Sequence, residues 1–95
     1  MKVSNMTSAK GNKIANQFII KSDDQDYHYE VFQSYDSVIA QMVTGFNGHV
    51  EINLDRNYWN YSVTTGKYRN QFLGETKAET QKKIDSGEYK LVDLN

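Results

Sequence analysis

The stretch "YSVTTGKYRNQFLGETKAETQKKIDSG", residues 61–87, decides the fold because the hydrophobic period changes there from that of a strand to that of a helix. Its apolar residues predict one helical stripe: Val63, Tyr68, Phe72 and Leu73. Gly74 follows where a helix favours a left-handed residue. Three hydroxyls are available to cap the helix start: Ser62, Thr64 and Thr65. We therefore expect a short first helix that ends just before Gly74.

A second helix follows within the same stretch. Thr76 and Glu79 have the spacing of a capping box, in which each side chain accepts the backbone N–H of the other residue. Gly87 can end the helix, because glycine adopts the left-handed conformation easily. The pattern predicts a helix from about Lys77 to Ser86.

The segments outside this stretch have the pattern of strands. Apolar and β-branched residues alternate or cluster in five segments: 18–20, 27–32, 37–43, 50–54 and 89–94. Short polar or glycine-containing runs at 22–26 and 44–48 predict turns. Segment 37–43 also permits a short helix capped by Asp36 or Ser37, but its β-branched residues favour a strand.

These elements predict an α+β fold. We expect a small single domain with a mostly antiparallel sheet and two short helices near the C-terminus, packed on one face of the sheet. The domain is expected to span residues 14–95. Residues 1–13 are polar and lack any period, so we expect them to form a flexible N-terminal arm.

The composition favours a cytoplasmic protein that makes no contact with membranes. The chain has 95 residues, a net charge of −1 and no cysteine. No apolar run approaches the roughly 18 residues of a membrane-spanning helix, and the N-terminus lacks the apolar segment of a secretory signal. The absence of cysteine excludes disulfides and fits a reducing compartment.

Sequence motifs of catalysis and metal binding are missing. The two histidines, His28 and His49, have no partner at a ligand-forming spacing. The acids at 23–26 lack the glycine and glutamate of a calcium loop. The Ser/Thr cluster at 62–65 has no histidine nearby in sequence to activate a nucleophile. We therefore expect no catalytic residue, no metal and no cofactor, and we do not expect an enzyme.

The charges are unevenly distributed. Residues 23–55 contain seven acids and no Lys or Arg, whereas residues 56–83 contain six bases and two acids. Unless the fold brings bases against it, the acidic segment leaves a negative surface for a partner. The candidate partner-binding acids are Asp23, Asp24, Asp26, Glu30 and Asp36.

The basic aromatic stretch 58–69 is the second candidate site. Hydroxyls and free N–H groups at a helix start attract anions, basic side chains add charge, and aromatic rings can stack. The residues are Tyr58, Trp59, Tyr61, Ser62, Thr64, Thr65, Lys67, Tyr68 and Arg69. The simpler interpretation, that these residues only cap and pack the helix, stays open beside it.

Three segments carry a resemblance to known proteins: "SYDSVIAQM" (34–42), "YWNYSVTTGKYRNQFLGETKAETQKKIDSG" (58–87) and "YKLVDLN" (89–95). They are similar to a group of small uncharacterised proteins of bacteriophages, mobile elements and archaeal viruses. The likeness covers roughly residues 33–95. Its most specific part is Tyr-Ser-x-Thr-Thr, five further residues, then Gln-Phe-Leu-Gly.

The resemblance implies an accessory or anti-defence role in the host cytoplasm. We expect a protein that binds and inhibits host machinery, such as a defence nuclease or its nucleic-acid complex, in the manner of an anti-CRISPR protein. The acidic stretch would fit a groove built for phosphates. One alternative is a nucleic-acid-binding module that uses residues 58–69. Another is a structural or regulatory homo-oligomer, such as a homodimer, that pairs through exposed strand edges.

Overall fold

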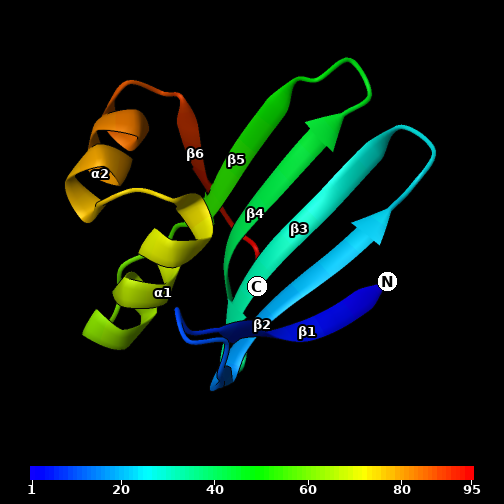
Figure 1. The fold of residues 1–95 in the computed structure, drawn as a ribbon. Helices are drawn as coiled ribbons and strands as arrows, with labels where there is room; N and C mark the ends of the chain where they lie inside the picture. Colours follow the sequence, from blue (N-terminus) through cyan, green and yellow to red (C-terminus); the bar gives the residue numbers. More distant parts are fainter.

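The computed structural model describes residues 1–95 and contains one six-stranded sheet and two helices (Figure 1). The elements in chain order are β1 (Lys2–Thr7), β2 (Lys13–Asp23), β3 (Tyr27–Ser34), β4 (Ser37–Gly45), β5 (Val50–Asp55), α1 (Val63–Leu73), α2 (Lys77–Asp85) and β6 (Tyr89–Val92). The expected α+β class with two short helices near the C-terminus is confirmed in outline.

The sheet is mixed, and its strands lie side by side in the order of the chain. Strands β1 to β5 form antiparallel pairs because short connections join them. Strand β6 instead runs parallel to β5, since both helices lie in the connection between them. Strands β1 and β6 are therefore the two edges of the sheet.

The N-terminal residues are not a flexible arm, as the sequence suggested, but include the edge strand β1. Val3 lies opposite Ile20 and Asn5 opposite Phe18 in the antiparallel pair with β2. Most side chains of β1 are exposed, which explains why the sequence shows no apolar period there. Backbone pairing and the burial of Met6, which packs with Phe32, hold the strand in place.

Segment 37–43 is a strand, as its β-branched residues predicted. It forms most of β4, which pairs with β3 on one side and β5 on the other. A bulge in the pairing of β3 with β4, between Phe32 and Gln33, shifts the register by one residue. Ile39 lies at this bulge and is fully buried with Phe32.

Both helices begin at predicted capping residues and α1 ends at the predicted Gly74, whereas α2 ends at Asp85 with Ser86, not Gly87, as its C-cap. The Ser62 hydroxyl accepts the N–H of Thr65 at 3.1 Å, and Gly74 closes α1 with a φ of 70°. In α2 the capping box is complete, with bonds of 3.2 and 3.0 Å between Thr76 and Glu79. One expectation for α1 was wrong: Val63 is 92% exposed, because it lies about 140° around the helix from Tyr68.

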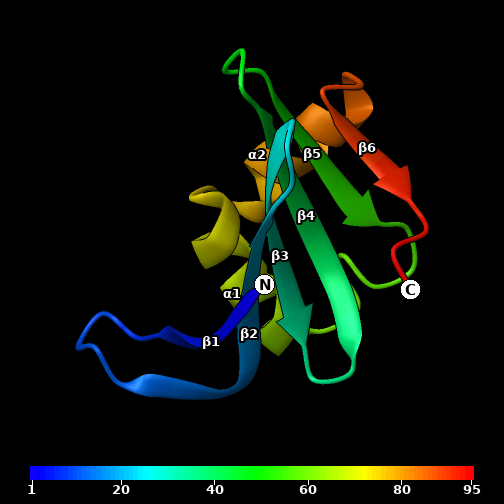
Figure 2. The ribbon, with the colours of Figure 1, turned by 90° about the vertical axis from the view of Figure 1, so that its right-hand side faces the viewer.

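The core lies between the helices and one face of the sheet, and both helices stand behind the sheet in Figure 2. Phe32, Ala40 and Leu54 are fully buried there. Phe72 of α1 packs against both parts of the core, and its ring centre lies 5.9 Å from that of Phe32. The β2–β3 and β4–β5 turns extend beyond the helices (Figure 1), so this end of the sheet is left uncovered.

Candidate functional site

An open pocket of about 640 Å³ lies at the start of α1 and contains three basic residues. No acidic residue lines it. The lining residues are Asn60, Tyr61, Ser62, Val63, Gly66, Lys67, Arg69, Asn70 and Lys77. We call it the Arg69 pocket, because Arg69 is the member with the most unusual environment.

The Arg69 side chain is buried, with 1% of its surface exposed, and it has no acidic partner. Its Nη1 donates to the Trp59 carbonyl at 2.7 Å and to the Asn60 Oδ1 at 3.4 Å, and its Nη2 donates to the Asn70 Oδ1 at 3.0 Å. The buried Nε has no hydrogen-bond partner. Burial lowers the pKa of the guanidinium, and the negative charge of Glu75 opposes this shift. Arg69 is therefore a buried cation held by neutral oxygens.

The basic aromatic stretch does not act as one surface. Tyr61, Ser62 and Lys67 line the Arg69 pocket together with Arg69. Tyr58 stands beside it, with its ring edge-on to Tyr61 at 5.4 Å between centres.

The remaining residues of the stretch are used for packing or lie outside the pocket. Trp59 packs against the core and under the Arg69 guanidinium, whose carbon is 5.2 Å from the ring centre. Tyr68 packs against the buried cluster that contains Phe32, and Thr65 is buried with its hydroxyl 3.3 Å from that of Ser34. Thr64 is exposed and does not line the pocket.

Five pocket residues were not predicted as site residues from the sequence: Asn60, Val63, Gly66, Asn70 and Lys77. Asn60 and Asn70 carry ordinary polar side chains, and nothing in the sequence marks either of them as an acceptor for Arg69. Lys77 comes from α2, and only the short connection between the helices brings it to the pocket. Of these residues, only Gly66 could have been noticed in the sequence. A glycine in the first turn destabilises a helix, so its presence there suggests a role other than helix formation.

The acidic residues of the β2–β3 turn form an ordered tip. Asp24 accepts the N–H groups of Asp26 and Tyr27 at 2.8 and 2.7 Å and the hydroxyl of Tyr29 at 2.9 Å. These hydrogen bonds, above all the one from Asp26, lower the pKa of the Asp24 carboxyl. Asp23 lies 2.6 Å from the Nδ1 of His28. The Asp26 carboxylate is exposed and forms no ion pair within 4.0 Å.

The other candidate acids do not join this tip. Glu30 pairs with Lys21 at 3.9 Å and with the Nε2 of His28 at 3.3 Å. Asp36 lies at the opposite end of β3, in the turn to β4. The five acids therefore do not form one continuous surface.

Two lysines from outside the acidic segment neutralise part of it, although the segment has no base of its own. Lys21 pairs with Glu30, and Lys90 pairs with Glu51 at 3.0 Å. Asp55 is buried and accepts the N–H groups of Asn57, Tyr58 and Leu94, so it is structural. The exposed carboxylates of the acidic segment without an ion pair are Asp24 and Asp26 at the β2–β3 tip and Asp36.

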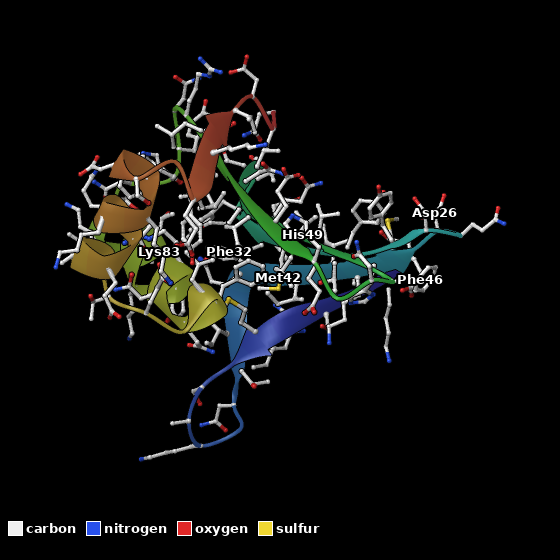
Figure 3. All side chains as sticks on the ribbon, turned by 90° about the horizontal axis from the view of Figure 1, so that it is seen from above. Asp26, Phe32, Met42, Phe46, His49 and Lys83 are labelled. Atoms are coloured by element: carbon white, nitrogen blue, oxygen red, sulfur yellow. The ribbon has the colours of Figure 1, made fainter.

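Exposed aromatic side chains lie at the same end of the sheet as the β2–β3 tip. Phe46, in the β4–β5 turn, is 78% exposed, and Tyr27 is 46% exposed. Figure 3 places Phe46 and Asp26 at this end, far from Lys83 on α2. We call this region the hairpin-end surface and define it by Asp23, Asp24, Asp26, Tyr27 and Phe46. Phe46 was not predicted as a site residue, although an aromatic residue in a glycine-rich turn indicates exposure.

A buried carboxylate ties α2 to the sheet. Glu75 Oε1 accepts from Lys83 Nζ at 2.8 Å and from the Tyr89 hydroxyl at 2.7 Å, and Oε2 accepts from the Thr80 hydroxyl at 2.6 Å. Burial opposes ionisation of Glu75, but the bonds from Lys83, Thr80 and Tyr89 prevail and lower its pKa. Burial and the contact with Glu75 raise the pKa of Tyr89 to about 12. The hydrogen bonds behind these pKa shifts stabilise the cluster, and they do not activate a nucleophile.

No group of three or more His, Asp or Glu side chains is placed to hold a metal ion. None of the helices has the length and apolar character needed to span a membrane.

The fold and its polar surfaces define a small α+β domain with a mixed sheet covered on one face by two helices. The chain belongs to the DUF8033 family, a family of unknown function, whose model matches residues 1–88. The match includes β1, in agreement with its place in the domain. No curated protein and no solved structure matches the chain significantly.

Proposed function

We propose that the chain is a small binding protein without catalytic activity, and that it attaches to a basic surface of a partner protein through the hairpin-end surface. The observation that carries the proposal is the exposure of Phe46, at 78%, at the same end of the sheet as the free carboxylate of Asp26 (Figure 3). Binding interfaces commonly combine a few aromatic side chains that supply most of the energy with a polar rim.

The order of the β2–β3 tip supports the proposal. Asp24 accepts two backbone N–H groups of its own turn and the Tyr29 hydroxyl, so the tip has a defined shape before any partner arrives. A surface that is already ordered loses less conformational entropy on binding. The free carboxylate of Asp26 then adds charge without the need for rearrangement, whereas the exposed Asp23 carboxylate is held by His28 at 2.6 Å.

The chemistry of the surface points to the kind of partner. Carboxylates attract a surface that carries Lys and Arg, and a groove that normally holds nucleic acid is such a surface. With the resemblance to phage and mobile-element proteins, this gives the role that we propose. The protein acts in the host cytoplasm as an accessory protein that inhibits a nucleic-acid-targeting defence nuclease, in the manner of an anti-CRISPR protein.

Direct binding of a nucleic-acid strand is the second candidate, and Lys67 and Lys77 beside Tyr61 favour it. Two observations place it second. Arg69 is buried, so only two cations of the pocket are free to move toward a strand. The net charge of −1 also gives little general attraction for phosphates.

A quantitative pull-down from defence-expressing host cells tests the proposal. The baits are the parent, the variant Asp23→Asn/Asp26→Asn/Phe46→Ser, and a control with the same loss of charge and apolar surface elsewhere, Asp36→Asn/Asp85→Asn/Val63→Ser. We expect the parent and the control to capture the same protein, the first variant to lose it, and nuclease treatment to leave the recovery unchanged. Capture that survives in the first variant, or disappears with nuclease, contradicts the proposal.

A further inference from the structure

We infer that the Arg69 pocket binds the phosphoryl group of a nucleotide, with Arg69 as the fixed anchor and Lys67 and Lys77 as mobile cations. The pocket lies at the start of α1, whereas the hairpin-end surface lies at the uncovered end of the sheet. The inference is therefore independent of the proposed partner protein, and either can fail alone.

The uncompensated charge of Arg69 is the first argument. A buried arginine is normally paired with a carboxylate or another anion, because an unpaired charge loses its hydration without compensation. No carboxylate lies within 4.0 Å of Arg69, and its partners are three neutral oxygens. An oxyanion in the pocket would supply the missing counter-charge.

The unused donors of Arg69 are the second argument. A guanidinium has five N–H donors. The bonds to Trp59, Asn60 and Asn70 use three of them, and Nε is buried without an acceptor. Holding the loop that precedes α1 therefore leaves part of the donor set free. Phosphate oxygens match the geometry of such donors.

The start of α1 adds further donors on the same side. Ser62 caps the helix by accepting the N–H of Thr65, but the N–H groups of the first turn before it have no partner within the helix. These groups and the helix dipole favour an anion at this end. Ser62, Val63 and Gly66 all line the pocket that contains Arg69.

Gly66 lies against the Arg69 guanidinium in the wall of the pocket. A Cβ built on Gly66 would lie 3.6 Å from Nη2 and 3.7 Å from Nη1 of Arg69. An alanine therefore fits without a clash, and it would strengthen the helix, since glycine is a poor helix former. The same methyl group would cover the guanidinium further, and Arg69 has only 1% of its surface exposed. Gly66 is thus a position where helix stability and ligand access oppose each other.

The size of the pocket and its aromatic wall favour a nucleotide over a bare ion. About 640 Å³ lies within the range of roughly 300–1,000 Å³ typical of sites for small organic ligands. Tyr61 lines the pocket and is 47% exposed, and Tyr58 supports its ring edge-on at 5.4 Å. A base can stack on Tyr61 while its phosphate reaches the cations.

The test is a set of titrations of the full chain, followed by backbone amide NMR shifts. The probes are inorganic phosphate, adenosine, AMP, and a dinucleotide with and without a 5′-phosphate. We expect AMP to shift the amides of residues 60–70, phosphate to do so more weakly, and adenosine to have no effect. If the 5′-phosphorylated dinucleotide binds more tightly than AMP, the phosphoryl group that the pocket binds is the 5′-phosphate at the end of a nucleic-acid strand.

Three variants make the test specific. Lys67→Gln/Lys77→Gln should lower the affinity for AMP by about tenfold or more. Lys10→Gln/Lys82→Gln removes the same charge elsewhere and should leave the affinity for AMP unchanged. Gly66→Ala should raise the melting temperature of the protein and lower its affinity for AMP. Equal binding of AMP and adenosine, no binding of any phosphorylated probe, or undiminished binding by the Lys67/Lys77 variant would overturn the inference.

Discussion

The Nη1 of Arg69 donates to the carbonyl oxygen of Trp59 at 2.7 Å, and the Arg69 guanidinium carbon lies 5.2 Å from the centre of the Trp59 ring. A single side chain of α1 thus holds both the backbone and the ring of the residue that precedes the helix in the loop. Because Trp59 also packs against the core cluster of Leu54 and Tyr89, this pair fixes the loop, the helix start and the pocket together.

The loss of the Arg69 side chain should destabilise the fold. Arg69→Ala leaves the oxygens of Trp59, Asn60 and Asn70 without their donor, and we expect unfolding to become easier by about 3 kcal/mol. Arg69→Lys keeps the charge but not the planar guanidinium, so its unfolding free energy should lie between those of the parent and Arg69→Ala. Urea denaturation measures the effect, and an Arg69→Ala protein as stable as the parent would refute the structural role.

The capping box of α2 should contribute measurably to stability. Thr76→Ala removes the hydroxyl that accepts the N–H of Glu79, and it should lower the unfolding free energy by about 1 kcal/mol. Thr64→Ala is the matched control, because that residue is exposed and its hydroxyl forms no hydrogen bond to another residue. A denaturation midpoint that stays unchanged in Thr76→Ala, at an unchanged slope, would count against the cap.

Glu75 should make stability depend on pH in the acid range. Its pKa in the folded state is lower than the ordinary value of 4.5, so its contribution is fully present above that value and is lost as the pH falls through the folded pKa. Glu75→Gln should therefore be less stable than the parent at pH 7, and the gap should narrow as the pH is lowered below 4.5. Glu88→Gln, at an exposed position, is the control. A gap that is constant with pH would contradict the assignment.

His28 should titrate above its ordinary pKa of 6.5. The hydrogen bond with Asp23 is the main cause, and the contact with Glu30 adds to it. The imidazolium form is thus favoured in the fold, and this contribution is lost as the pH rises through the raised pKa. NMR titration of the imidazole protons should show the midpoint fall in Asp23→Asn. An unchanged midpoint would mean that the Asp23 contact does not persist in solution.

Local sequence signals predicted those parts of the fold that local chemistry determines. Ser62, Gly74 and the Thr76–Glu79 pair act on backbone groups a few residues away, and all three caps are present in the structure. Strand β1 was missed because backbone pairing and a single buried side chain, Met6, hold it in place, and its other side chains leave no apolar period.

The candidate sites were harder to predict because they depend on tertiary placement. From the sequence, Arg69 was predicted to be one of the basic residues of a binding surface, but the fold buries it against Trp59. Lys77 reaches the pocket from a different helix. The acidic run looked continuous, yet Lys21 and Lys90 come from other strands to neutralise part of it. None of these contacts can be read from neighbours in the chain.

The central claim, that the hairpin-end surface binds a basic partner protein, is tested most directly by the kinetics of association with the captured partner at about 0.05 and 0.3 M salt. Charges at the rim of an interface act mainly on association, whereas a buried aromatic anchor acts mainly on dissociation. We predict that Asp23→Asn/Asp26→Asn slows association and reduces its salt dependence. Phe46→Ser should accelerate dissociation, and Asp36→Asn/Asp85→Asn should change neither rate. If both hairpin-end variants bind with the rates of the parent, the surface is only a solvated end of the sheet and the claim is wrong.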